Sequence, residues 1–380
     1  MDLREQTMEY RKLKTINDYI RKSVNPAKSP DTLFEMYSVP IFETGHPEYL
    51  LGREIASNKT VVQKNDILLC KINPRINRVW IVADESENPN IASSEWIVVR
   101  SSKYNPEFLV WYFRSPRFKN LMTSEVTGIG GSLTRAQPKS VAEYPVPVLE
   151  KPEQDAIAII FNTVDTIIKK RRRQLQKLDE LVKARFVEMF GDPVVNPKGF
   201  PCYTIGEVID FQGGSQPDKK YFEYEPSPDN IRLIQIRDYK SDKYITYIPK
   251  TMAKRFCTAD DIMIGRYGPP IFQILKGIEG SFNVALMKAT PKIGNKEFIR
   301  QFLKQDCLLE YLEGLSKRTA GQDGIQMDKL KAYPFPYPPI ELQEQFAAFV
   351  AQTDKSKVAV QKALDEAQLL FDSLMQKYFG

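Results

Sequence analysis

The sequence repeats itself at a fixed offset of 189 positions (333 minus 144), and this repeat constrains the fold more than any other feature. Segment 144–147 (Tyr-Pro-Val-Pro) matches segment 333–336 (Tyr-Pro-Phe-Pro), and the ungapped match continues to Phe190-Gly191 and Phe379-Gly380. A repeat this long is larger than a solenoid unit. It therefore predicts two similar globular modules, each followed by its own helix. Matched pairs in between include Gln154 with Gln343 and Asp165 with Asp354.

Length and composition indicate a globular protein with hydrophobic cores and no membrane span. A chain of 380 residues predicts about two to three domains. No apolar run reaches the roughly 18 residues of a membrane span, and the charged N-terminal segment Met1-Asp2-Leu3-Arg4-Glu5 lacks an apolar signal core. The four cysteines form no Cys-x-x-Cys pair, which is typical of reduced thiols. We therefore expect a cytoplasmic protein with no membrane partner.

The two predicted modules, 1–143 and 194–332, are β-rich. Short strand-like runs such as 66–70, 79–82 and 95–99 are bounded by Asn, Asp, Pro and Gly. In each module a helical stretch follows, at about 105–125 and 296–303. The openings Asn65-Asp66 and Asp260-Asp261 resemble the start of the same strand. The fold class is therefore α+β.

The segments 144–193 and 333–380 each predict one long helix, at about 152–190 and 341–379. Pro152 suits a first helical position and Gly191 a helix end. Apolar residues recur every seventh position, which is a coiled-coil signal that favours pairing of the two helices. Arg171 and Lys357 interrupt the two seams. The predicted seam residues are Phe161, Ile168, Leu175, Val182, Met189, Phe346, Val350, Leu364, Phe371 and Tyr378.

The usual signatures of catalysis are missing. His46 is the only histidine, in a Gly-His-Pro context, so a surface or hydrogen-bonding role is favoured over catalysis or zinc binding. No Gly-x-x-x-x-Gly-Lys-Ser/Thr phosphate loop or Gly-x-Gly-x-x-Gly motif occurs. No Asn/Asp-Pro-Pro-Tyr/Phe motif of amino-methyltransferases and no Glu-x-Lys nuclease element occurs either. These features predict a binding protein with no catalytic, cofactor or metal residues of its own.

The ordered set of segments resembles the specificity (S) subunits of type I restriction-modification systems. The stretch 178–193 (LDELVKARFVEMFGDP) is similar to the central conserved helix of that family. Segments 261–268 and 280–287, and the order module, helix, module, helix, are similar as well. The resemblance covers the whole chain.

This resemblance implies two target recognition domains, each contacting one half of a bipartite, asymmetric DNA sequence. It implies that the helices form an antiparallel coiled coil that fixes the spacer between the halves. Two methyltransferase subunits and two restriction/translocase subunits would be the protein partners. Adenine methylation would use S-adenosylmethionine in the methyltransferase, and ATP and Mg would belong to the restriction subunit.

Loops rich in Arg, Lys, Asn and Gln on a β scaffold are the expected readers of double-stranded DNA, because these side chains match base edges in the major groove. For each residue the alternative is a solvated loop charge. The net charge of +6 permits a polyanion partner without requiring one. The predicted DNA-contacting residues are Lys71, Arg75, Arg78, Ser132, Thr134, Arg135 and Gln137 in the first module, and Gln216, Lys219, Lys220, Arg237, Arg266, Tyr267, Gln322 and Gln326 in the second.

Two further interpretations stay open at this point. The chain could be the specificity subunit of a restriction-methylation enzyme outside type I, or a coiled-coil scaffold that binds proteins instead of DNA. The basic run Lys169–Arg173 lies in the middle of the first long helix. It could be solvated, face a partner protein or approach the phosphates of the DNA spacer.

Overall fold

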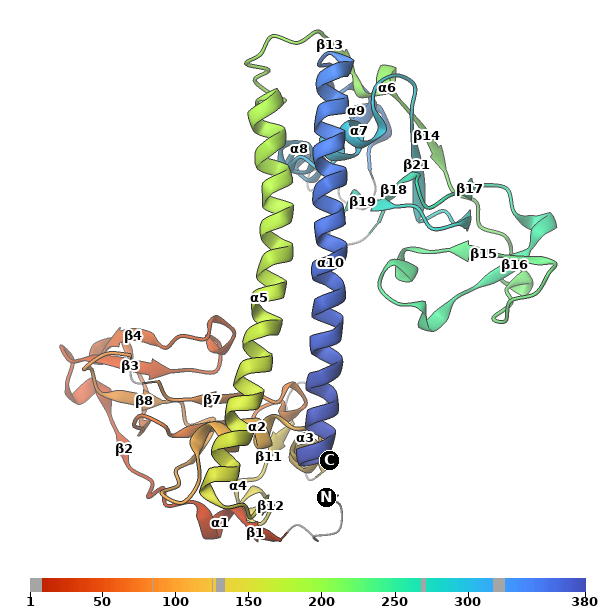
Figure 1. Cartoon of the computed structure of the whole chain (residues 1–380). Coiled ribbons are helices and arrows are strands. Elements are labelled where there is room, and N and C mark those ends of the chain that lie inside the picture. The colour runs from red at the N-terminus through yellow and green to blue at the C-terminus, as the bar shows by residue number, and fades with distance from the viewer. Residues whose placement is uncertain (1–8, 84, 125, 128–133, 268–270, 317–324) are drawn as a thin grey trace. The chain divides into compact units, whose positions relative to one another are not determined.

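The computed structural model describes residues 9–83, 85–124, 126–127, 134–267, 271–316 and 325–380 (Figure 1). The chain forms two compact units. Unit 1 consists of Met1–Arg172 with Lys362–Gly380, and unit 2 of Arg173–Gln361. We call the part of each unit outside the two long helices its module. Among the described residues, no helix is long and apolar enough to span a membrane.

The module of unit 1 is built on two sheets. The first sheet has the order β2-β5-β8-β3-β4, and β3 and β8 are parallel while the other neighbours are antiparallel. The second is antiparallel in the order β7-β6-β9, with β6 in the middle. The strands are β2 (Ser23–Val24), β3 (Leu33–Tyr37), β4 (Glu48–Leu51), β5 (Lys59–Val61), β6 (Ile67–Cys70), β7 (Val79–Ile81), β8 (Asn90–Ala92) and β9 (Trp96–Val99).

The module of unit 2 has the corresponding pair of sheets. One has the order β16-β15-β20-β17, with β15 and β20 parallel, and the other is the antiparallel sheet β14-β21-β18-β19. The strands are β14 (Ile209–Gly213), β15 (Asn230–Ile234), β16 (Tyr247–Pro249), β17 (Phe256–Cys257), β18 (Ile262–Gly265), β19 (Gln273–Lys276), β20 (Gly280–Phe282) and β21 (Leu286–Pro291).

The predicted strand openings are confirmed. Asp66 accepts a hydrogen bond from the backbone N of Gln63 (2.9 Å), and Asp261 accepts one from the backbone N of Thr258 (2.9 Å). Each aspartate thus closes a turn directly before the strand that runs through its antiparallel sheet, β6 or β18. A side-chain carboxylate suits this position because it can satisfy a turn N–H that has no strand partner.

The helical stretch expected at about 105–125 is confirmed, and it consists of two helices, α2 (Pro106–Arg114) and α3 (Pro116–Ser124). Ser115 between them is extended (φ −65°, ψ 152°). Proline disfavours the helical conformation of the residue before it and is tolerated in the first turn of a new helix, so Pro116 ends one helix and starts the next. The corresponding helices of unit 2 are α7 (Lys296–Leu303), as predicted, and α8 (Asp306–Ser316).

Both long helices are confirmed to within one residue at each end. They are α5 (Lys151–Phe190) and α10 (Ile340–Phe379). In unit 1, Phe161 of α5 stacks on Phe379 (ring centroids 5.4 Å apart), and Arg172 contacts Gln368 further along. As α5 advances, its partners in α10 therefore have lower numbers, so the pairing is antiparallel (Figure 1).

Unit 2 pairs the other halves of the same helices in the same sense. Phe190 meets Phe346 at 5.4 Å between ring centroids, and Asp179 of α5 forms a 2.7 Å ion pair with Lys357. The interruption of the seam at Lys357 is thus compensated by a carboxylate from the opposite helix. Each core combines a module with both helices: α2 and Phe161 with Phe379 in one, and α7 and Phe186 with Phe346 in the other.

The predicted seam positions differ in burial. Phe161, Ile168, Val182, Phe346 and Val350 are buried, whereas Leu175, Met189, Leu364, Phe371 and Tyr378 are half-buried. The heptad pattern alone did not identify Phe186, Phe190 and Phe379, which are also buried.

The 189-residue repeat appears as one hydrogen-bond network built twice. Buried Gln154 accepts from the backbone N of Asn105 (2.7 Å) and donates to the carbonyl of Leu149 (2.8 Å). Buried Gln343 accepts from the backbone N of Asn295 (2.9 Å) and donates to the carbonyl of Pro338 (2.7 Å). Each glutamine therefore ties the start of a long helix to a module.

The two asparagines complete this network. Asn105 caps α2 and Asn295 caps α7, each by accepting from two backbone N–H groups of the first turn. The repeated Tyr-Pro-x-Pro segments form β12 (Pro145–Pro147) and β22 (Pro334–Pro336). These strands pair with the first strand of each module, β1 (Tyr10–Lys12) and β13 (Cys202–Thr204).

Candidate nucleic-acid interface

The loop between β6 and β7 carries three of the predicted DNA-contacting residues. It turns sharply because Asn73 and Asn77 both adopt positive φ (48° and 53°), which Asn tolerates better than most residues. Between them, η4 (Pro74–Ile76) forms one 3-10 turn. Arg75 is exposed, and its Nε donates to Asn73 Oδ1 at 3.1 Å. The loop therefore holds this cation in a defined place.

The structure brings a second predicted group onto this loop. The backbone N of Asn73 donates to the carbonyl of Thr134 (2.8 Å), and the N of Ala136 donates to the carbonyl of Lys71 (3.0 Å). An isolated bridge joins Ile72 and Arg135. Lys71, Arg75, Thr134 and Arg135 thus share one end of the β7-β6-β9 sheet, although about 60 residues separate the two segments. Ser132 lies outside the described residues.

In unit 2, Arg266 stands where Lys71 stands in unit 1. Each directly follows an inner strand of its antiparallel sheet, β6 or β18. The backbone N of Lys71 donates to the carbonyl of Glu95 (3.0 Å), and that of Arg266 to the carbonyl of Ala285 (2.9 Å). Glu95 and Ala285 directly precede β9 and β21. Two cations predicted separately from the sequence therefore occupy equivalent positions.

Arg266 lies beside glycine-rich backbone. Its guanidinium carbon is 5.3 Å from the ring centre of Tyr267, and a Cβ at Gly213 would be 3.9 Å from one of its terminal nitrogens. A Cβ at Gly214 would come within 1.9 Å of the Asn283 carbonyl, so only glycine fits there. The segment before Gln216 is thereby held next to Arg266.

The remaining predicted residues of unit 2 lie elsewhere. Lys219 and Lys220 are exposed on η5 (Lys219–Tyr221). Arg237 lies on η6 (Ile236–Tyr239) and donates to Thr246 Oγ1 at 3.0 Å. Gln326 directly precedes α9 (Met327–Ala332), just as Gln137 directly precedes α4 (Pro138–Val141). Gln322 lies outside the described residues. Which of these residues contact DNA stays a prediction.

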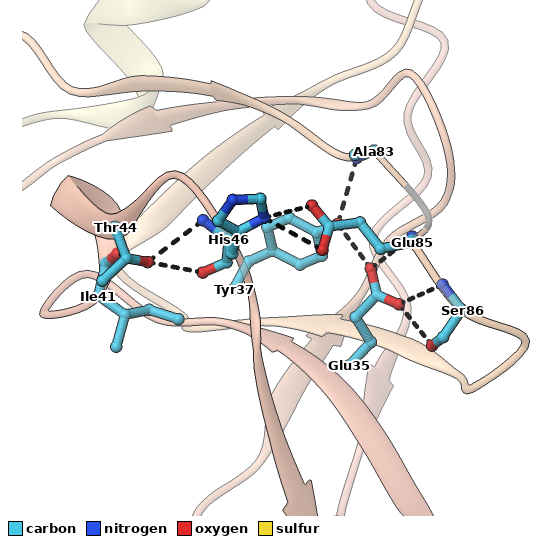
Figure 2. Close-up of polar contacts among 8 residues, drawn as sticks. All are labelled: Glu35, Tyr37, Ile41, Thr44, His46, Ala83, Glu85 and Ser86. Carbon is cyan, nitrogen blue, oxygen red and sulfur yellow. Dashed lines mark hydrogen bonds and ion pairs between the residues drawn. The ribbon is translucent and has the colours of Figure 1, made fainter. Parts of the chain in front are cut away.

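His46 belongs to a polar cluster on the first sheet (Figure 2). Its side chain is 74% exposed, and its Nδ1 is 3.0 Å from Glu85 Oε1, so the predicted surface and hydrogen-bonding role is confirmed. Beneath it, buried Glu35 accepts from Tyr37 OH (2.8 Å), the N of Glu85 (3.0 Å) and both the N and Oγ of Ser86 (2.9 and 2.6 Å). Glu35 thereby anchors the connection between β7 and β8.

Burial raises the pKa of the Glu35 carboxyl, but the hydrogen bonds from Ser86, Glu85 and Tyr37 outweigh it and hold the pKa below its usual range. The carboxylate is therefore ionised and fully used as an acceptor, which marks it as a structural anchor. Among the residues that the structure describes, no three His, Cys, Asp or Glu side chains are grouped as metal ligands. All four cysteines are free.

Comparison with known proteins shows what this arrangement is similar to. A model of the "Type I restriction modification DNA specificity domain" matches residues 197–367. The S subunit of a type I restriction-modification system from M. genitalium is 15% identical, with a TM-score of 0.61 over 100% of this chain and 98% of that one.

A chain from a study of complex assembly and conformational transition of the type I R-M system is 19% identical. It has a TM-score of 0.55 over 98% of this chain and 97% of that one. At these identities the two structures establish the fold along the whole chain, and the family model applies to residues 197–367. Residues 197–367 are therefore similar to the type I restriction modification DNA specificity domain, and the whole chain has the fold of these two solved structures.

Proposed function

We propose that the chain is the DNA sequence-recognition subunit of a type I restriction-modification complex, and that each module reads one half of a bipartite, asymmetric target. The main support is the duplication. A DNA specificity domain matches residues 197–367, and unit 1 repeats the sheets, the capped helix and the glutamine network of that domain. Two scaffolds of one design with different loops suit two different half-sites.

The proposed DNA-facing edge of each module is the C-terminal end of an inner strand of its antiparallel sheet, β6 or β18. Lys71 and Arg266 supply cations at this edge, and Arg75 and Arg135 add two more in unit 1. Cations there can pair with phosphates or with guanine acceptors in the major groove. The loops are fixed by backbone hydrogen bonds, which lowers the entropy cost of binding.

We further propose that α5 and α10 set the spacer between the half-sites. Each is a continuous helix of 40 residues, which corresponds to about 60 Å. The proposed protein partners are two methyltransferase subunits and two restriction/translocase subunits in the cytoplasm. Methylation of adenine with S-adenosylmethionine, and ATP- and Mg-dependent restriction, would take place in those partners, while this chain supplies recognition and no catalysis.

The test is to map methylated adenines in a host that carries the neighbouring methyltransferase with and without this chain. The proposal predicts a two-part motif with a fixed gap that disappears with the chain. If the methyltransferase folds with the chain and is active but produces no chain-dependent motif, the protein-binding scaffold becomes the better explanation.

A further inference from the structure

One acidic side chain stands among the cations at the proposed DNA-facing edge of unit 1. Glu95 lies in the turn before β9, and its backbone carbonyl accepts from the N of Lys71 (3.0 Å). Its Oε1 is 3.4 Å from a terminal nitrogen of Arg135, which is a long contact. The sequence offered no signal for this residue, because neither its neighbours nor its spacing form a motif.

Three side chains at this edge have a buried polar atom that forms no hydrogen bond within the part of the chain that the structure describes. These atoms are Oε2 of Glu95, Nε of Arg78 and Oγ1 of Thr134. The backbone N of Cys70 donates to the carbonyl of Arg78 (3.1 Å), and the N of Lys71 donates to the carbonyl of Glu95 (3.0 Å), so both residues lie beside the end of β6. Unpaired buried polar atoms are rare and mark places where water or a ligand completes the hydrogen bonding.

Unit 2 supports the same interpretation of the edge. At its equivalent edge Arg266 also has a buried Nε without a partner among the described residues. The position equivalent to Glu95 is Ala285, however, so the carboxylate is a feature of unit 1 alone. The two edges have equivalent cations but only unit 1 has a carboxylate, which suits a difference in the bases that the two modules select.

The chemistry of a carboxylate restricts its partner on DNA. An ionised carboxylate only accepts hydrogen bonds and is repelled by phosphate. In the major groove the donors are the exocyclic amino groups, N4 of cytosine and N6 of adenine, and acidic side chains pair with the former. We propose that Glu95 accepts a hydrogen bond from the exocyclic amino group of one base in the half-site read by unit 1, with Arg78 and Thr134 beside it. This inference rests on the proposed function.

The test uses the full chain with its methyltransferase partner and compares wild type with Glu95→Ala, Glu95→Gln and Thr134→Val. Methylated motifs are mapped in cells, and binding is measured by competition between DNA duplexes that carry each of the four bases at every half-site position. Glu43→Gln is the matched control, because Glu43 is an exposed acidic residue on η2 (Phe42–Thr44) in the same module.

We expect Glu95→Ala to reduce discrimination at one base pair of one half-site, by roughly 5- to 150-fold, with the other half-site unchanged. Where wild type prefers cytosine, Glu95→Gln should move the preference toward adenine, because an amide pairs with N6 and N7 of adenine; where wild type prefers adenine, Glu95→Gln should retain that preference. The base preferred by wild type identifies the source: cytosine for N4, adenine for N6. Thr134→Val should affect the same or the adjacent position, and the control should leave both half-sites intact.

An unaltered motif in both Glu95 variants, even with weaker binding, would overturn the inference and leave Glu95 as a residue that only orients Arg135. If Glu95→Ala abolishes folding, Glu95→Gln carries the test because it keeps the size of the side chain. If wild type itself shows no chain-dependent motif, the proposed function fails and Glu95 has no half-site to read.

Discussion

The duplicated glutamine network gives a prediction whose size follows from the structure. In Gln343→Ala, the backbone N–H of Asn295 and the carbonyl of Pro338 both lose their side-chain partner inside the protein. An unpaired buried polar group costs about 1–3 kcal/mol, so two groups cost about 2–6 kcal/mol. The destabilisation should be local, because Asn295 is the cap of α7.

Amide hydrogen exchange followed by mass spectrometry measures this local destabilisation. We expect α7 in Gln343→Ala to exchange at least about 30-fold faster, which corresponds to the lower limit of about 2 kcal/mol. Helix α2 should be unaffected. Gln154→Ala should give the opposite pattern, with faster exchange in α2 and an unchanged exchange rate in α7.

The control is Gln352→Ala, an exposed glutamine on the same helix, which should change neither α2 nor α7. If Gln343→Ala leaves the exchange of α7 unchanged, the network does not tie the module to the long helix. Equal acceleration of both short helices would show that the two units unfold as one body, and would refute the local interpretation.

Three further predictions concern stability and charge. Asp66→Ala should destabilise unit 1 by about 3 kcal/mol or more, because it leaves Arg100 without its buried partner (2.6 and 2.7 Å); urea unfolding measures this. The pKa of the Glu35 carboxyl is lower in the folded protein than in the unfolded chain, so the ionised carboxylate stabilises unit 1 at pH values above the ordinary Glu pKa of about 4.3. This stabilisation is lost as the pH falls through the pKa of the folded protein. If Lys169–Arg173 faces DNA phosphates, neutralising all five residues should weaken binding to all sequences and flatten its salt dependence by about one unit of slope for each phosphate that is no longer neutralised.

Each of these predictions has its own control. Asp31→Ala removes an exposed ion pair with Arg53 and should change stability by no more than about 0.5 kcal/mol; an effect as large as that of Asp66→Ala would contradict the reasoning. Glu35→Gln should remove the acid-dependent loss of stability, and an unchanged pH profile would show that other groups cause it. An unaltered salt slope would place the basic run away from DNA.

The long helices could be predicted from the sequence because their determinants are local and periodic. A heptad pattern, a proline near the start and a glycine after the end define α5 almost to the residue. The break at Ser115 was missed because the apolar pattern continues across it, although Pro116 was visible in the sequence. The match of Gln154 with Gln343 was also visible, but its function depends on backbone groups about 50 residues away.

The candidate interface could be predicted only in part, because residue types are visible in the sequence but tertiary contacts are not. Arg, Lys and Gln in loops identify residues that can contact DNA, and two of them, Lys71 and Arg266, proved to be structurally equivalent. The contact between the β6–β7 loop and Thr134 depends on tertiary pairing, which no local pattern encodes. Glu95 was missed because a lone glutamate in a turn has no distinguishing sequence signal until its unpaired oxygen is seen among cations.

The central claim, that each module reads its own half-site, is tested most directly by DNA footprinting of the assembled complex with Lys71→Ala and Arg266→Ala. Footprinting detects protection of phosphates as well as of bases, so it does not depend on which of the two a side chain touches. We predict that Lys71→Ala reduces protection in one half of the target and Arg266→Ala in the other half. Reduced protection in the same half for both variants, or full protection in both, would contradict the claim.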